Sequence, residues 1–213
     1  KLIYLVLTAF IFPANAGSFE DWFLAIRQDK AAEVTSLLQR GFDPNTIGPD
    51  GLHGLFLAVR EGALKSAMVL AEWPKTQVEW RSDKDESPLM LAALKGQEDV
   101  VRKLIDRGAD VNKPGWTPLH YASTNGHVGI MNLLLEHHAY LDAESPNKTT
   151  PLMMAAFYGS SQAVKLLLEA GADPTLRNEQ GLSAVDFAQR GKRPDAAAMI
   201  AESIRNRKPK GQW

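Results

Sequence analysis

The stretch that decides the fold reads Trp116-Thr117-Pro118-Leu119-His120-Tyr121-Ala122-Ser123-Thr124-Asn125-Gly126-His127-Val128. Pro118 suits the first turn of a helix, because its missing N–H needs no partner there. Thr117, just before it, can cap the helix with its hydroxyl group. Leu119 and Ala122 are three residues apart and so lie on one helix face. Gly126 can end the helix because glycine tolerates a positive φ. The stretch therefore predicts a short helix with one apolar face.

The same pattern recurs along the chain. A second copy occupies residues 150–159, 33 residues later by its proline, and a third follows after another 33 at 183–188. Earlier copies lie at 87–96 and, in degenerate form, at 53–62. Trp22 and its neighbours fall in the same phase, in a first helix expected at residues 19–28. In the third unit, helices are expected near residues 88–95 and 98–106. Six units in one phase predict a solenoid, in which each unit buries its apolar face against the next.

Thr-Pro-Leu-His-x-Ala followed by Gly-His, at residues 117–127, is the signature of an ankyrin repeat. Three unit endings also agree with one another, at residues 37–45, 104–112 and 167–175. From about residue 18 onward the chain resembles ankyrin-repeat proteins. The resemblance implies an all-α solenoid of about six stacked helix-turn-helix units with β-hairpin-like loops and atypical capping repeats at both ends. The expected repeat domain covers residues 17–205, with repeats near 17–48, 49–81, 82–112, 113–144, 145–177 and 178–205.

Two junctions between repeats depart from the pattern. Pro74 replaces part of the usual Gly-Ala step after the second repeat and should stop the outer helix there. The link at residues 112–116 is three residues shorter than the family spacing. We therefore expect the hairpin tip at Lys113–Trp116 to be clipped, with a notch in the binding groove beside Trp116.

Composition excludes several classes of function. The 213 residues are 45% hydrophobic and 23% charged, with a formal net charge of −1, so no strong field points to nucleic acid or to an anionic membrane. The chain contains no cysteine, which rules out disulfides, thiol catalysis and thiolate metal sites.

The two ends of the chain differ in character from the repeats. Residues 1–16 place a lysine before an apolar run and end in Ala-Asn-Ala, which is the layout of a secretory signal peptide. We expect cleavage between Ala16 and Gly17. The alternative is a membrane anchor, but the apolar run is too short to span a bilayer. Residues 206–213 are expected to form a basic tail.

No catalytic or metal-binding constellation stands out. A metal site would need several ligands converging at one point, whereas the histidines occupy repeat junctions and helix ends, at positions 53, 120, 127, 137 and 138. Ser123, His120 and Asp142 could be imagined as a triad, but no nucleophile elbow surrounds the serine. No glycine-rich phosphate loop is present. We therefore expect no enzyme activity and no cofactor, because no segment large enough for a separate catalytic domain is left.

The resemblance implies that a partner protein binds a concave groove lined by the hairpin tips and the inner helices. The positions predicted to bind are Arg60, Glu61, Lys84, Glu86, Lys95, Trp116, Thr124, Asn125, Phe157 and Tyr158, with Leu94, Thr149, Leu182 and Arg190 at the remaining variable positions. Trp116, Phe157 and Tyr158 are adjacent in repeat space and predict an aromatic hot spot. The alternative is that Phe157 tucks between repeats and only Tyr158 reaches solvent.

These observations predict a non-catalytic protein-binding module, exported to the periplasm and monomeric, that binds neither nucleic acid nor, after cleavage, a membrane. The chain resembles the signal-peptide-bearing periplasmic ankyrin proteins of Gram-negative bacteria. That resemblance implies support of an oxidative-stress enzyme such as catalase. The alternatives are a toxin-neutralising, immunity-type protein and a secreted effector.

Overall fold

The computed structural model describes residues 14–207, and their side chains from residue 18 onward. The described residues form twelve helices arranged as six pairs, which confirms the predicted all-α solenoid. The inner helices of the pairs are α1 (Ala14–Arg27), α3 (Gly54–Glu61), α5 (Pro88–Lys95), α7 (Pro118–Asn125), α9 (Pro151–Phe157) and α11 (Ala184–Arg190). The outer helices are α2 (Ala31–Gln39), α4 (Leu64–Glu72), α6 (Glu98–Asp106), α8 (Val128–Glu136), α10 (Ser161–Glu169) and α12 (Pro194–Asn206).

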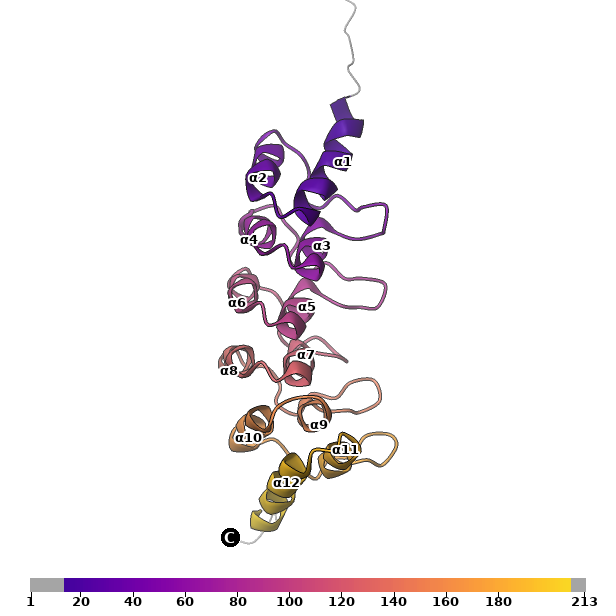
Figure 1. The fold of residues 1–213 in the computed structure, drawn as a ribbon, viewed down its shortest axis with the longest axis vertical. Helices are drawn as coiled ribbons and strands as arrows, with labels where there is room; N and C mark the ends of the chain where they lie inside the picture. The colour runs from indigo at the N-terminus through magenta and orange to yellow at the C-terminus, as the bar shows by residue number, and fades with distance from the viewer. Residues whose placement is uncertain (1–13, 208–213) are drawn as a thin grey trace, which may run out of the picture.

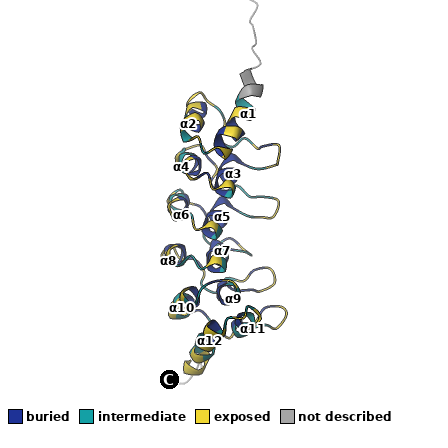
Figure 2. Ribbon diagram, in the orientation of Figure 1, coloured by how far each residue is buried: buried dark blue, intermediate teal, exposed yellow. Residues whose placement is uncertain are grey.

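The helix pairs stack into an elongated column, with hairpin loops projecting from the side of the inner helices (Figure 1). Each inner helix packs against the inner helix of the next pair, as α5 does against α7 and α7 against α9. Buried residues follow the faces where the helices meet, so the core is a continuous strip (Figure 2). Leu119 and Ala122 are both fully buried in this strip, as their spacing predicted.

Helix ends carry the predicted caps, with one difference. Ser87 and Thr150 accept hydrogen bonds from the backbone N–H groups of Met90 and Met153, at 3.1 and 3.4 Å. Thr117 also stands at an N-cap, but its hydroxyl contacts Nδ1 of His120, at 2.9 Å, instead of a backbone N–H. The imidazole in turn accepts a hydrogen bond from the backbone N–H of Thr117, at 3.1 Å, as the third helical residue does in a capping box.

Four of the hairpin loops are closed by the same pair of backbone hydrogen bonds. In the loop between the fifth and sixth pairs, for example, the N–H of Asn178 bonds to the carbonyl of Leu182, and the N–H of Gly181 to that of Asn178. No such pair closes the described loop at residues 112–116, and this loop reaches out less far than its neighbours (Figure 1). The clipped hairpin predicted from the spacing is thus confirmed.

The outer helix of the second pair ends where Pro74 predicted. Helix α4 stops at Glu72, and Trp73 is its extended C-cap. Arg107, from the third pair, donates hydrogen bonds to the carbonyls of Ala71, Trp73 and Pro74. The guanidinium thus satisfies carbonyl groups that the ended helix leaves without an intrahelical partner.

The two ends differ from expectation in their boundaries. Helix α1 begins at Ala14, not at Phe19, and so runs across the expected cleavage position. Most of the expected signal peptide lies outside the described residues. Asn206, assigned to the tail, is the last residue of α12, and residues 208–213 also lie outside the described part. Among the described helices, none combines the length and apolar character that crossing a membrane would require.

Candidate protein-binding groove

The predicted binding residues lie on one side of the solenoid, which we call the inner-helix face. It is made of the exposed positions of the inner helices and of the hairpin loops in front of them. Its N-terminal half carries charges that neutralise one another. Asp50 accepts an ion pair from Arg27, at 3.2 Å, and another from Arg60, at 3.4 Å, and Arg60 also contacts Glu61, at 3.0 Å. Such exposed pairs contribute little stability, but the charges of these four residues balance one another.

Three predicted binding residues are already engaged within the chain. The hydroxyl of Tyr121 donates a hydrogen bond to Glu86, at 3.1 Å. The hydroxyl of Thr124 donates to the carbonyl of His120 on its own helix, at 2.9 Å. The side-chain amide of Asn125 donates to the carbonyl of Leu94 in the preceding repeat, at 2.8 Å. The bonds of Glu86 and Asn125 therefore connect neighbouring repeats, while that of Thr124 stays within α7.

Lys84 and Lys95 are exposed, on a hairpin tip and at the end of α5 respectively. The geometry of the N-terminal half is therefore a charged, hydrogen-bonded surface with two free lysine side chains that can meet a partner.

The C-terminal half of the inner-helix face contains a pocket of about 280 Å³ in which several aromatic side chains meet. We call it the aromatic pocket. It is lined by Trp116, Asn147, Thr149, Met154, Phe157, Tyr158, Asn178, Gln180, Leu182, Phe187 and Arg190. The structure thus brings together the three aromatic residues that the repeat spacing had placed side by side.

The aromatic rings are arranged edge to face or tilted. The ring centroid of Phe157 lies 4.3 Å from that of Tyr158 and 6.2 Å from that of Phe187. Phe157 is half-buried, whereas Tyr158 is 58% exposed. Both interpretations of Phe157 therefore hold in part, since it packs between repeats and still lines the pocket.

Met154 and Phe187 line the pocket but were not predicted. They are 33 residues apart and occupy the same position of successive inner helices, in register with Tyr121. The repeat phase could have found them, but an apolar residue on an inner helix is more often part of the core.

A family profile described as "Ankyrin repeats (3 copies)" matches residues 22–114 and 112–178. The chain belongs to the ankyrin-repeat family. Its relatives include the neurogenic locus notch homolog protein 1 of Xenopus tropicalis, 31% identical over 183 residues, and ankyrin repeat and SAM domain-containing protein 6 of Mus musculus, 36% identical over 135 residues. These matches cover 78% and 59% of this chain but only 7% and 15% of the relatives.

A solved structure is also similar over most of the chain. It is the complex of a predatory endopeptidase from Bdellovibrio bacteriovorus with an immunity protein. The similarity has a TM-score of 0.74 at 25% identity, and it covers 86% of this chain and 97% of the matched chain. Ankyrin repeats are protein-interaction modules, so this ankyrin-repeat chain is one as well.

Trp116, at the edge of the aromatic pocket, is held in place by contacts with buried residues. Its ring packs edge-on against His120, with 5.2 Å between centroids. His120 accepts a hydrogen bond from the N–H of Thr117 and donates to the carbonyl of Thr149 in the next hairpin, at 3.1 and 2.9 Å. Burial lowers the pKa of His120 to about 4, so the ring is neutral near pH 7. The neutral imidazole thereby joins the fourth repeat to the fifth behind the pocket.

The clipped loop is anchored on the other side of Trp116. Lys113 is buried, with 8% of its side chain exposed, and pairs with Asp85 at the preceding hairpin tip. The hydrogen bond from Lys113 lowers the pKa of Asp85. Gly115 has a φ of +83°, a conformation that other residues adopt only with strain. The loop is thus short and fixed.

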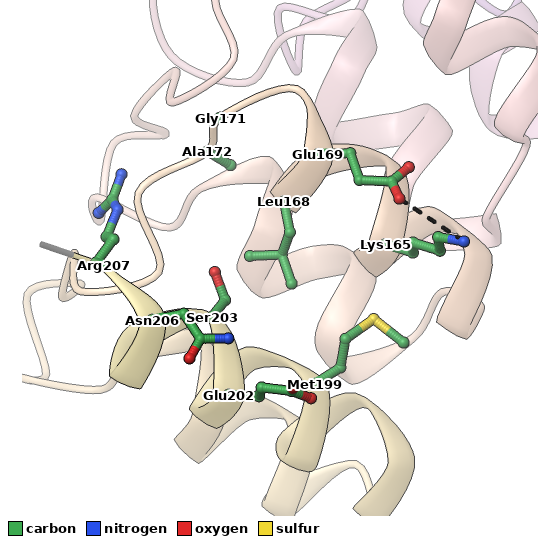
Figure 3. A pocket seen from close by; sticks show the side chains of 10 residues that line it. All are labelled: Lys165, Leu168, Glu169, Gly171, Ala172, Met199, Glu202, Ser203, Asn206 and Arg207. Carbon is green, nitrogen blue, oxygen red and sulfur yellow. Dashed lines mark ion pairs between the residues drawn. The ribbon is translucent and has the colours of Figure 1, made fainter.

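A larger recess, of about 640 Å³, lies on the opposite side of the solenoid, between the outer helices α10 and α12 (Figure 3). Leu168 and Met199 point into it, and an ion pair of 3.7 Å between Lys165 and Glu169 crosses one end. It contains none of the predicted binding residues. Within residues 14–207, no group of three or more metal-ligating side chains is assembled.

The three residues considered above as a triad have other roles. His120 bonds to Thr117 and Thr149, and the carboxylate of Asp142 accepts a hydrogen bond from the N–H of Asp173, at 3.0 Å. Ser123 is fully buried. The hydrogen bonds of His120 and Asp142 therefore serve contacts between repeats.

Proposed function

We propose that this chain is an immunity-type protein, which binds a potentially harmful enzyme through the inner-helix face and thereby restrains it. The observation that carries the proposal is the similarity, across 97% of the matched chain, to a chain in a complex of an endopeptidase with an immunity protein. The aromatic pocket supports it, because clustered aromatic side chains on a rigid surface are typical of binding hot spots. A module of this kind needs no catalytic group of its own.

We further propose that the chain acts in the periplasm, on the basis of the signal-peptide pattern in residues 1–16. The test is expression of the full chain in a Gram-negative host, followed by cell fractionation and N-terminal sequencing. A periplasmic product starting at Gly17 is expected. A product that stays in the cytoplasm with residues 1–16 intact would contradict the proposal. The roles in supporting catalase and as a secreted effector stay predictions from resemblance, since no feature of the site favours them.

The binding proposal is tested with two matched pairs of substitutions. Trp116→Ala with Tyr158→Ala removes two aromatic side chains from the aromatic pocket. Leu64→Ala with Tyr140→Ala removes two exposed apolar side chains outside the inner-helix face. Each chain is immobilised and exposed to periplasmic extract of the source organism, and captured proteins are identified by mass spectrometry and assayed for peptide-bond hydrolysis.

We expect wild type and the control pair to capture a hydrolase and to suppress its activity. The pocket pair should bind it at least tenfold more weakly, because truncating one hot-spot residue costs about 2 kcal/mol or more. Equal capture by all three chains would mean that the partner binds elsewhere. Capture without any change in hydrolase activity would exclude the immunity role.

A further inference from the structure

The charge of the aromatic pocket is one-sided. Its lining contains aromatic and aliphatic side chains, neutral amides and hydroxyls, and one cation, Arg190. No aspartate or glutamate is among the lining residues. A partner group that enters this pocket therefore meets positive charge with no compensating carboxylate in the lining.

Arg190 lies at the end of α11 and is exposed. Within residues 14–207, no carboxylate lies within ion-pair distance of its guanidinium. Asp186, one turn earlier on its helix, accepts hydrogen bonds from the hydroxyl and the N–H of Ser183, at 2.6 and 2.7 Å. These bonds and, at longer range, the charges of Arg177 and Arg190 lower the pKa of Asp186. The contrast with Arg27 and Arg60 is direct, since both of those arginines share the carboxylate of Asp50.

The size of the aromatic pocket indicates what can enter it. Pockets for small molecules usually measure roughly 300–1,000 Å³, and this one, at about 280 Å³, is smaller. Its lining includes the apolar side chains of Met154, Phe157 and Phe187 from two successive inner helices. These features suit one bulky apolar side chain of a protein, with Arg190 within reach of the residue beside it.

The clipped loop adds a further constraint. At the other described junctions, a closed hairpin tip stands in front of the inner helices, but residues 112–116 lack that tip. Trp116 therefore borders the pocket from a shortened loop, which Lys113 holds against the preceding tip. This leaves room for a protruding loop of a partner rather than only for a flat surface.

We infer that the aromatic pocket receives a partner loop in which a bulky aromatic or aliphatic residue is followed by an acidic residue. The apolar side chain fills the pocket, and the carboxylate pairs with Arg190. This inference rests on the proposed binding function and specifies the chemistry of the partner segment.

The test uses blocked hexapeptides of sequence Gly-Ser-Trp-Glu-Gly-Ser, together with versions in which glutamate is replaced by glutamine or lysine, or tryptophan by alanine. Binding to the intact chain is followed by titration of the Met154 methyl resonance in a ¹³C-methyl-methionine spectrum. We expect the Trp-Glu peptide to bind about three- to fivefold more tightly than the Trp-Gln peptide, which is the range of a partly exposed ion pair. The lysine version should bind more weakly still, and the alanine version should give no saturable shift.

Substitutions of arginine separate this ion pair from general effects. Arg190→Gln should bind the Trp-Glu and Trp-Gln peptides equally, and Arg190→Lys should keep part of the preference. Arg205→Gln, a matched change at an exposed position of the outer helix α12, should keep all of it. Raising the salt concentration should reduce the preference in the wild type.

Three results would overturn the inference: no saturable shift of Met154 with the Trp-Glu peptide, equal binding of the glutamate and lysine versions, or a preference that survives Arg190→Gln. These outcomes are distinct from failure of the proposed function. If partner capture depends on Trp116 and Tyr158 while the peptides show no preference for glutamate, the binding function stands and the inference is wrong. If capture does not depend on them, the binding function itself has been placed on the wrong surface.

Discussion

Acidification to pH 5 should destabilise the solenoid through two buried histidines, His53 and His120. Each accepts a hydrogen bond at Nδ1 from a backbone N–H, that of Leu55 for His53 and that of Thr117 for His120, at 3.3 and 3.1 Å. Protonation of Nδ1 would remove the acceptor and bury a charge. Burial accordingly lowers the pKa of both histidines from 6.5 to about 4, and nearby Asp43 raises that of His53 only in part.

The sign follows from proton binding. As the pH falls below 6.5, each histidine becomes protonated in the unfolded chain, whereas in the folded chain it stays neutral until about pH 4. The free energy of unfolding therefore decreases as the pH falls from 6.5 to 4. At about 1.36 kcal/mol per pH unit, each histidine lowers the free energy of unfolding by about 2 kcal/mol between pH 6.5 and pH 5. Together the two should lower the free energy of unfolding by about 4 kcal/mol. Glu79 contributes with the opposite sign, because burial raises its pKa.

The assay is urea unfolding followed by far-UV circular dichroism, at pH 7.5 and pH 5.0. Wild type is compared with His53→Gln, with His120→Gln and with the double variant, since glutamine can accept and donate hydrogen bonds but does not titrate. Each single variant should lose about half of the pH effect, and the double variant nearly all of it. If His120→Gln kept the full pH response of the wild type, our explanation of the buried imidazole would be refuted. An independent check is the NMR titration of the two rings, which should stay neutral down to about pH 4.

Three further predictions concern the core and the clipped loop. Leu119→Ala should lower the free energy of unfolding by about 3 kcal/mol, because the side chain is fully buried between inner helices, whereas Leu64→Ala, at a position 47% exposed, should cost far less in the same urea experiment. Gly115→Ala should cost about 1 kcal/mol, because φ is +83°; a variant as stable as wild type would show that the loop relaxes at no cost. Asp85→Asn should lower the melting temperature more than Lys113→Met does. Asp85→Asn leaves the buried ammonium group of Lys113 without its carboxylate, whereas Lys113→Met removes the buried charge itself. A larger decrease for Lys113→Met would contradict this explanation of the ion pair.

Much of the fold could be predicted because its signals are local. Helices α5 and α6 begin and end at the residues expected. In α5, Pro88 occupies the first helical position and Gly96 is the C-cap, so both ends follow from the residue types. The start of α1 was wrong by five residues, because no such capping residue marks it. The capping of α7 was predicted in part, since Thr117 is its N-cap, but the hydroxyl contacts a buried imidazole whose orientation depends on the next repeat.

The candidate site was predictable only in part. The stride of the repeats placed Trp116, Phe157 and Tyr158 close together, and the structure gathers them around one pocket. The repeat spacing could not show that Glu86 and Asn125 form hydrogen bonds with residues of neighbouring repeats, because these bonds connect residues 31 to 35 positions apart. They depend on the rotamers that the packed helices allow.

The sequence by itself determined the helix pairs, their order of stacking and the shortened loop before Trp116, because spacing, proline and glycine act through the local backbone. Only the tertiary structure decided which surface charges are paired and which are not. Arg60 forms an ion pair with Asp50, while Arg190 lines a pocket and forms no ion pair at contact distance with any described residue. The two arginines stand at related positions at the ends of inner helices, and the hairpin position that holds Asp50 beside Arg60 holds Gln180 in the repeat of Arg190. The sequence contains this difference, but only the packing of each hairpin against its helix shows that these side chains lie close together.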